Sequence, residues 1–223
     1  MIPLVVVPLP PECPADVSLW RIDIAFGARL DDPMFASLSD DERTRANAFH
    51  RSMDALRFAM VRAALRGLLA ERLGIAAKDV RFVSDEAGRP SLADENTHAI
   101  DFNVSHSGNH GLIALSVRRR VGVDIEERAT QFDWRTVAEI ALSPHERDAV
   151  ERLAVHAQTD AFYDIWVTKE AILKALGMGI TKGMQHFSVW PCRDDVQGIA
   201  TAPLSMPPGY AACLAWSAAA FRT

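Results

Sequence analysis

Apolar positions along the chain recur with two different spacings, and each spacing predicts one kind of element. Between residues 53 and 73, apolar side chains recur every four positions and Gly74 follows, which predicts a helix that ends at this glycine. The segment before it, SDDERTRANAFH, predicts another helix, because Ser39 suits an N-cap and the early acids suit the positive end of a helix. Later helices are predicted from Ser143, where Ser-Pro suits a helix start, and over residues 161–176.

Short apolar runs between turn-forming segments predict the strands. Strands are predicted at residues 80–83, 99–104, 112–117, 121–126, 186–190, 196–202 and 210–218. Each half of the chain holds a long helix that ends at a Leu-Gly pair and is followed by about three strands. The plan predicts an α+β fold of two similar lobes, residues 1–117 and 118–223, with a ligand cleft near their join.

Composition narrows the class of protein. With 223 residues, 49% of them hydrophobic, the chain can bury a sizeable core. The apolar start, MIPLVVVPLPPECP, is interrupted by prolines and no basic residues precede it, so we expect neither a signal peptide nor a membrane segment. Three cysteines without a CxxC pair argue against a disulfide framework and a zinc site, and they favour a reducing, cytoplasmic setting.

The charges are distributed unevenly. A formal net charge of −5 argues against general nucleic-acid binding. However, seven arginines lie between residues 43 and 72. From the residues alone, the simplest interpretation of this run is the solvated face of a helix.

Two carboxylates interrupt the apolar run VGVDIE, residues 121–126. Side chains alternate along a strand, so Asp124 and Glu126 point to the same face, together with Gly122. Buried carboxylates are costly unless a cation offsets their charge, and Mg²⁺ prefers oxygen ligands. The run therefore indicates either a hard-metal site or the solvated face of an edge strand.

A third carboxylate lies in WVTKEAILKALGMG, residues 166–179. At helical spacing, Trp166, Glu170 and Lys174 share one face, so Glu170 can join the two strand acids while Lys174 lies one turn further on. Three acids and a lysine suit a metal-bound pyrophosphate, because the ammonium can take up charge that develops on a leaving group. The alternative is an ordinary Glu-Lys pair on an exposed helix.

Two further segments indicate anion binding. In FNVSHSGNHG, residues 102–111, Ser105 and His106 precede a flexible glycine turn that can approach a phosphate. Adjacent strand residues point to opposite faces, so these two are badly placed to act as a nucleophile and its base. In EAGRP, residues 86–90, Arg89 is presented by a turn, where it can clamp a phosphate or face water.

Taken in order, the motifs GRP (88–90), FNVSHSG (102–108), VGVDIE (121–126) and WVTKEAILKALGMG (166–179) resemble those of the Sfp-type 4′-phosphopantetheinyl transferases, in their WxxKEA variant. The likeness begins upstream, at SDDERTRANAFHRSMDALRFAMVRAALR (39–66), and covers residues 39 to 189. The length favours this two-lobed class, with its lobes in a pseudo-twofold arrangement, over the shorter, trimeric holo-acyl-carrier-protein synthases.

The resemblance implies a cytoplasmic, monomeric enzyme with coenzyme A as co-substrate. It would transfer the 4′-phosphopantetheine group to a serine of an apo acyl or peptidyl carrier protein and release adenosine 3′,5′-bisphosphate. It implies that Asp124, Glu126 and Glu170 hold Mg²⁺, with Asp124 and Glu170 among the catalytic residues. Glu170 would also be the base for the carrier serine, directly or through a water, and Lys174 would contact the pyrophosphate as both a catalytic and a coenzyme-binding residue.

The resemblance also implies a coenzyme A site that gives the arginine run a purpose. Ser105 and His106 would bind the side of the coenzyme that carries the 3′-phosphate, with Arg89 near the adenine and ribose phosphate. The basic lining would be completed by Arg45, Arg57 and Arg62. Glu42 departs from the pattern, because better-known relatives carry at its position a lysine that touches coenzyme A. The exposed turn Arg118 to Arg120 would either steer an acidic carrier protein or simply be solvated.

Two other functions use the same residues. A Mg²⁺-dependent hydrolase, such as a nuclease or a nucleotide pyrophosphatase, would need the three acids and a positioned water. A non-catalytic coenzyme A or nucleotide binder would need only the phosphate-binding residues. Transfer of label from coenzyme A to a carrier protein distinguishes the transferase from both.

Overall fold

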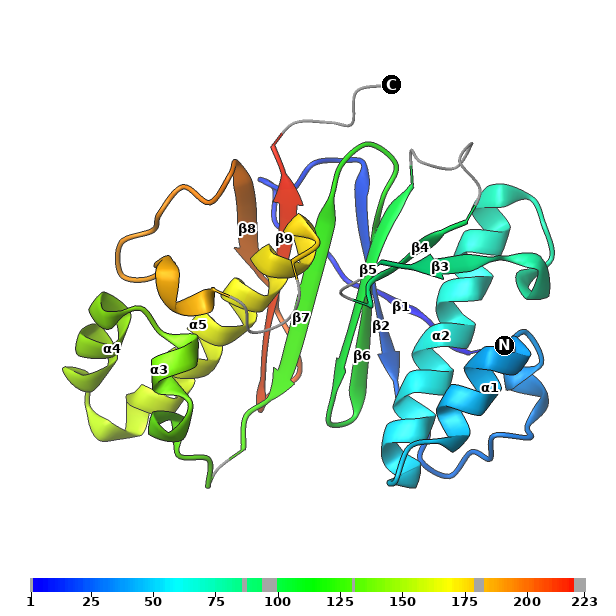
Figure 1. Ribbon diagram of the computed structural model, residues 1–223, viewed down its shortest axis with the longest axis horizontal. Helices are drawn as coiled ribbons and strands as arrows, with labels where there is room; N and C mark the ends of the chain where they lie inside the picture. Colours follow the sequence, from blue (N-terminus) through cyan, green and yellow to red (C-terminus); the bar gives the residue numbers. More distant parts are fainter. Residues whose placement is uncertain (1, 86–87, 94–99, 130, 179–182, 219–223) are drawn as a thin grey trace.

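The computed structural model describes residues 2–85, 88–93, 100–129, 131–178 and 183–218. Two antiparallel sheets lie face to face at its centre, and one long helix covers the outer face of each sheet (Figure 1). The α+β class and the two similar lobes predicted from the sequence are confirmed. The predicted domain boundary at residues 117–118 falls between the last strand of one sheet and the first strand of the other; the division into two domains itself stays a prediction.

The first sheet has the strand order β1-β2-β6-β5. Its strands are β1 (Val5–Val6), β2 (Val17–Asp23), β6 (His110–Ser116) and β5 (Asp101–Ser107). The helix α2 (Ser52–Leu73) covers its outer face, and α1 (Asp40–Asn47) packs beside α2 (Figure 1). A two-stranded sheet of β3 (Phe82–Ser84) and β4 (Pro90–Leu92) and the 3-10 turns η1 (Pro33–Phe35) and η2 (Ala77–Asp79) complete this lobe.

The second sheet has the order β7-β9-β8. Its strands are β7 (Val121–Glu127), β9 (Tyr210–Ser217) and β8 (Ile199–Pro203). The helix α5 (Val155–Leu176) covers its outer face. Shorter elements pack around α5: η4 (Trp134–Thr136), α3 (Ala138–Ala141), α4 (Pro144–Glu151) and η5 (Met184–His186).

A shared apolar core lies between the two sheets. Leu19, Leu112 and Ala114 of the first sheet are in one cluster with Val123 and Leu214 of the second, and all five are at most 1% exposed. Burial of branched side chains from both lobes stabilises their association, because each such side chain contributes about 1.5–3 kcal/mol when it leaves water. The site discussed below lies at one edge of this interface.

Most of the predicted helix ends are confirmed. The side chains of Ser39 and Ser143 each accept a hydrogen bond from the backbone N–H three residues on. The glutamate at that position accepts a hydrogen bond from the backbone N–H of the serine, which completes a capping box. Gly74 ends α2 in the left-handed conformation, with a φ of 66°. The helix predicted over 161–176 begins earlier, at Val155.

The strand predictions are less accurate. The strand predicted at residues 186–190 is wrong, because the N–H groups of Ser188 and Val189 donate to the side chains of Asp194 and Glu146 and not to a neighbouring strand. The short strands β1 and β4 and the central strand β2 were not predicted. Residue 99, the start of one predicted strand, lies outside the described residues, as does Met1.

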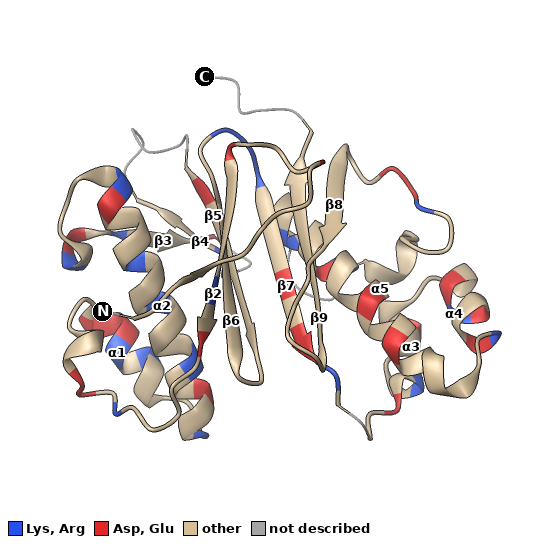
Figure 2. Ribbon diagram, turned by 180° about the vertical axis from the view of Figure 1, so that it is seen from behind, with Lys and Arg blue, Asp and Glu red and all other residues tan. Residues whose placement is uncertain are grey.

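No helix in the described ranges combines the length and the apolar character needed to cross a membrane. Figure 2 shows the charge distribution, with acidic positions along β7 and α5 and basic positions in the loop that leads into β7.

The strands β5 and β7, at the edges of their sheets, meet through side chains. The side chain of every second residue of β5 accepts a hydrogen bond from the backbone N–H of the residue of β7 that faces it. The pairs are Val121 to Asp101 at 2.8 Å, Val123 to Asn103 at 3.0 Å, Ile125 to Ser105 at 3.4 Å and Glu127 to Ser107 at 3.0 Å. The N–H groups along the edge of β7 that faces β5 are thereby satisfied by polar side chains of the other lobe.

Gly122 sets the distance between β7 and α5. A methyl group added at this position would overlap the carbonyl oxygen of Ala171 and lie 2.5 Å from the nitrogen of Ala175. Both obstacles are helix backbone, which cannot turn aside as a side chain can. The glycine in VGVDIE therefore allows the helix to lie directly against the strand.

We predict that Gly122→Ala lowers the free energy of unfolding by about 2 kcal/mol or more, because the helix must move away from the strand. Gly67→Ala is the matched control, since a methyl group at this exposed position in α2 meets no atom within 4 Å among the described residues. It should stabilise the protein by about 0.5–1 kcal/mol. Urea denaturation measures both changes, and equal effects of the two substitutions would contradict this role of Gly122.

Candidate active site

A cavity of about 420 Å³ opens at the join of the two lobes. One part of its wall comes from α2 and β5, and the other from β7 and α5. Of the residues predicted for the site, the cavity is lined by Arg45, Arg62, Arg89, Ser105, His106, Asp124, Glu126, Glu170 and Lys174. The structure therefore brings together residues that are far apart in the sequence.

Asp124 and Glu170 form the buried centre of this wall. Asp124 lies on β7 and Glu170 on α5, and each residue is only 3% exposed. The ammonium of Lys174 lies 2.6 Å from Oδ1 of Asp124, and it also donates to the Ser105 hydroxyl at 3.2 Å. Asp124 Oδ2 and Glu170 Oε1 have no hydrogen-bond partner within the described part of the chain. Among the described residues, these two buried acceptors therefore have no donor, which a buried polar group ordinarily has.

The carboxylates repel one another. Burial, and then the charge of Asp124, raise the pKa of Glu126 from 4.5 to about 7. The same two causes raise the pKa of Glu170 to about 7, while Lys174 acts in the opposite direction. A cation among these groups would relieve both the burial cost and the repulsion.

Over the described ranges, no three His, Cys, Asp or Glu side chains stand in the arrangement of a formed metal site. The chemistry of the donor set nevertheless fits a hard cation. Asp124, Glu126 and Glu170 offer only oxygen ligands, and two of those oxygens are buried and have no partner in the described ranges. These residues can therefore hold Mg²⁺ once their side chains turn toward it.

Basic and aromatic residues form the wall near α2. The guanidinium groups of Arg45 and Arg62 lie 5.1 and 5.7 Å from the ring centre of Phe58, which also lines the cavity. His106 lies on the same wall and is exposed, whereas its neighbour Ser105 turns toward Asp124 and donates to it at 2.8 Å. As predicted, the two side chains point to opposite faces of β5. His106 therefore lies on the basic wall near α2, and Ser105 lies on the acidic wall near β7.

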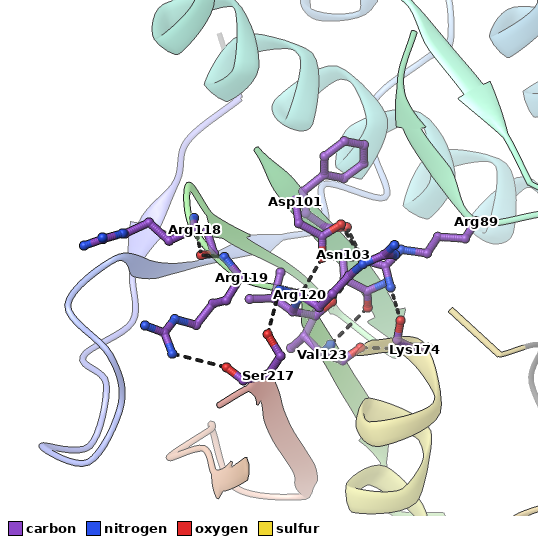
Figure 3. Close-up of polar contacts among 12 residues, drawn as sticks. Arg89, Asp101, Asn103, Arg118, Arg119, Arg120, Val123, Lys174 and Ser217 are labelled. Atoms are coloured by element: carbon purple, nitrogen blue, oxygen red, sulfur yellow. Dashed lines mark hydrogen bonds and ion pairs between the residues drawn. The ribbon is translucent and has the colours of Figure 1, made fainter. Parts of the chain in front are cut away.

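Arg89 ties several elements together, as Figure 3 shows. Its guanidinium donates to both carboxylate oxygens of Asp101, at 2.8 and 2.7 Å, and to the carbonyl of Lys174. It also donates to the carbonyls of Phe102 and Val121, at 3.2 and 3.1 Å. These bonds connect β5 and β7 with the last turn of α5. The contact with coenzyme A that the resemblance implies for Arg89 stays a prediction.

Arg57 is not among the described residues that line the cavity. Its guanidinium donates to the carbonyl of Gly108 at 2.7 Å and to Asp54 at 2.6 Å. It therefore supports the turn that follows Ser105 and His106. Its predicted coenzyme A contact stays a prediction.

Two family models match the chain, and together they cover the site. The model described as the 4′-phosphopantetheinyl transferase superfamily matches residues 120–217. The model described as 4′-phosphopantetheinyl transferase, N-terminal, matches residues 32–118. The 4′-phosphopantetheinyl transferase HetI of Nostoc sp. is 34% identical over 168 residues, which are 75% of this chain and 71% of HetI. The chain belongs to the 4′-phosphopantetheinyl transferase superfamily.

Other relatives lead to the same family. The 4′-phosphopantetheinyl transferase Sfp of Bacillus subtilis is 27% identical over 173 residues, which are 74% of this chain and 75% of Sfp. A protein of Synechocystis sp. is 38% identical over 151 residues, which span 68% of this chain and 61% of that relative. The resemblance to Sfp-type transferases found in the motifs is confirmed.

The contacts of two polar residues in this transferase-family chain were not predicted from the sequence. Glu42, the departure from the motif, accepts a hydrogen bond from Arg66 at 2.7 Å and lies 3.6 Å from Arg62. It therefore neutralises arginines of α2. Lys169, next to Glu170, forms a fully buried ion pair with Glu146 and donates to two backbone carbonyls. The only sequence signal for this pair is a lysine on an otherwise apolar face of the helix.

The raised pKa values predict a pH dependence of stability. A carboxyl group with a pKa of about 7 in the folded state and an ordinary pKa of 4.5 in the unfolded state stabilises the fold when protonated. This contribution is present below the unfolded pKa and is lost as the pH rises through the folded pKa. Without divalent cations, the free energy of unfolding should therefore fall between about pH 5 and pH 8.

Urea denaturation in EDTA across this range measures the effect. Other groups titrate as well, so the comparison is with the double variant Glu126→Gln/Glu170→Gln. The wild type should lose more stability than this variant as the pH rises. Parallel curves for the two proteins would show that these carboxyl groups do not carry the dependence.

Proposed function

We propose that this protein transfers the 4′-phosphopantetheine group of coenzyme A to a serine of an apo acyl or peptidyl carrier protein. The observation that supports this most strongly is the meeting of Asp124, Glu170 and Lys174 beside a basic wall. Adenosine 3′,5′-bisphosphate would be the second product. The proposal includes action as a cytoplasmic monomer.

The chemistry asks for positioning and charge neutralisation and needs no nucleophile from the enzyme. The hydroxyl oxygen of the carrier serine attacks the phosphorus next to the pantetheine, and the bond to the adenosine bisphosphate oxygen breaks. Glu170, directly or through a water, takes the serine proton. Lys174 stabilises the negative charge on the departing bisphosphate.

Asp124, Glu126 and Glu170 would hold Mg²⁺. When bound, the ion supplies positive charge that neutralises the pyrophosphate oxygens. Lys174 already neutralises Asp124 in part, at 2.6 Å, so the acids and the lysine form one charge system. Ser105 and His106 would bind the side of coenzyme A that carries the 3′-phosphate, with Arg89 near the adenine and ribose phosphate. Arg45, Arg57 and Arg62 would complete the basic lining.

A labelling reaction tests the transfer. Purified protein, Mg²⁺, fluorescent coenzyme A and several apo acyl and peptidyl carrier proteins are mixed, and label on the carrier is measured. We predict that Asp124→Ala and Glu170→Ala each abolish labelling while the protein stays folded. Asp160→Ala is the control, since it removes an exposed carboxylate from the same helix as Glu170, and it should label at the wild-type rate.

No labelling of any carrier by the wild type would overturn the proposal, and so would release of products from coenzyme A without a carrier. Such a release would favour a hydrolase. Retained labelling by either active-site variant would refute the metal assignment while the transferase remains.

His106 is predicted to act in binding. His106→Ala should raise the KM for coenzyme A by about 10-fold or more and change kcat less, because a charge-assisted hydrogen bond is worth about 1.5–3 kcal/mol. Steady-state kinetics with coenzyme A as the varied substrate measure this. An unchanged KM would remove His106 from the phosphate site.

A further inference from the structure

Ser107 connects the N-terminal lobe with a carboxylate of the candidate site. Its hydroxyl donates to Oε2 of Glu126 at 2.8 Å. The hydroxyl oxygen of Ser107 also accepts a hydrogen bond from the backbone N–H of Glu127 at 3.0 Å. Ser107 is half-buried at the end of β5, while both of its partners belong to β7 of the other lobe.

The neighbouring serine on the same face of β5 repeats this arrangement. Ser105 donates to Oδ1 of Asp124 at 2.8 Å and accepts the N–H of Ile125 at 3.4 Å. Each serine thus accepts from the strand and donates to the carboxylate one residue earlier. The same pair of hydrogen bonds therefore occurs at both serines, each beside a carboxylate of the candidate site.

A hydroxyl group is suited to this double contact. It carries one donor and two acceptor sites, so a bond accepted from the β7 backbone leaves its proton for the carboxylate. An ionised carboxylate in the same place would accept the N–H but could not donate, as at Asp101, where Val121 donates at 2.8 Å. The rotation of the serine hydroxyl is fixed by the backbone, and the hydroxyl in turn orients the carboxylate.

We propose that Ser107 is a positioning residue that holds the Glu126 carboxylate in place for a divalent cation. The inference rests on the proposed function, because Mg²⁺ is part of that function. It makes the metal site depend on the N-terminal lobe, although all three carboxylates lie in the C-terminal half. Residues that orient metal ligands typically contribute 10–100-fold to metal affinity.

The test compares three substitutions. Ser107→Ala removes the hydroxyl, and Ser107→Thr keeps it. Ser116→Ala is the matched control, because Ser116 is a strand serine of the same sheet that donates to a carboxylate, Asp16, at 2.6 Å. It also accepts the N–H groups of Arg118 and Arg119, at 3.1 Å each, outside the cavity.

Calorimetric titration with Mg²⁺, in the presence of coenzyme A, measures the metal affinity, and urea denaturation measures stability. Ser107→Ala should weaken Mg²⁺ binding by about 10–100-fold, and Ser107→Thr should stay within about 3-fold of the wild type. Ser116→Ala should lose stability without losing affinity. High Mg²⁺ should restore the transfer rate of Ser107→Ala.

Different failures have different meanings. Wild-type affinity in Ser107→Ala, or equal loss in Ser116→Ala, overturns the positioning role while the transferase remains. A wild type that binds no Mg²⁺ and labels no carrier overturns both the positioning role and the proposed function.

Discussion

The backbone N–H groups along the free edge of β7 are the constraint on which the rest depends. A buried N–H without an acceptor costs free energy, and a bare strand edge invites pairing with other chains. Here side chains of β5 supply the acceptors, from Asp101 to Ser107. The lobes are thereby held in one register, and the last two acceptors, both serines, also hold the acids of the candidate site.

A different contact fixes the face of β7 that packs against α5. Gly122 lets α5 lie against the strand, so Lys174 reaches Asp124 and the charge of Asp124 acts on Glu170. The position of β7 is therefore fixed twice. Side chains of β5 bind its edge, and the missing side chain of Gly122 allows close contact with α5. The acids meet at this strand and the basic residues line the wall of the other lobe, an arrangement suited to a substrate with a pyrophosphate and a further phosphate.

Local patterns predicted much of this site, and long-range partners explain what they missed. Strand alternation predicted that Asp124 and Glu126 share a face, and helical spacing added Glu170. The hydrogen bonds of Arg89 to β5, β7 and α5 depend on tertiary structure. The same is true of the hydrogen bonds that the N–H groups of Ser188 and Val189 donate to Asp194 and Glu146. Sequence periodicity carries no information on such partners.

The central claim is that carboxylates of β7 and α5 share one divalent cation at the join of the lobes. Crystals grown with Mn²⁺ and coenzyme A, with the Mn²⁺ located by its anomalous scattering, test it most directly. The account predicts one strong peak within coordination distance of Asp124, Glu126 and Glu170, next to the pyrophosphate. A bound coenzyme with its Mn²⁺ elsewhere, and these carboxylates still without a cation, would contradict it.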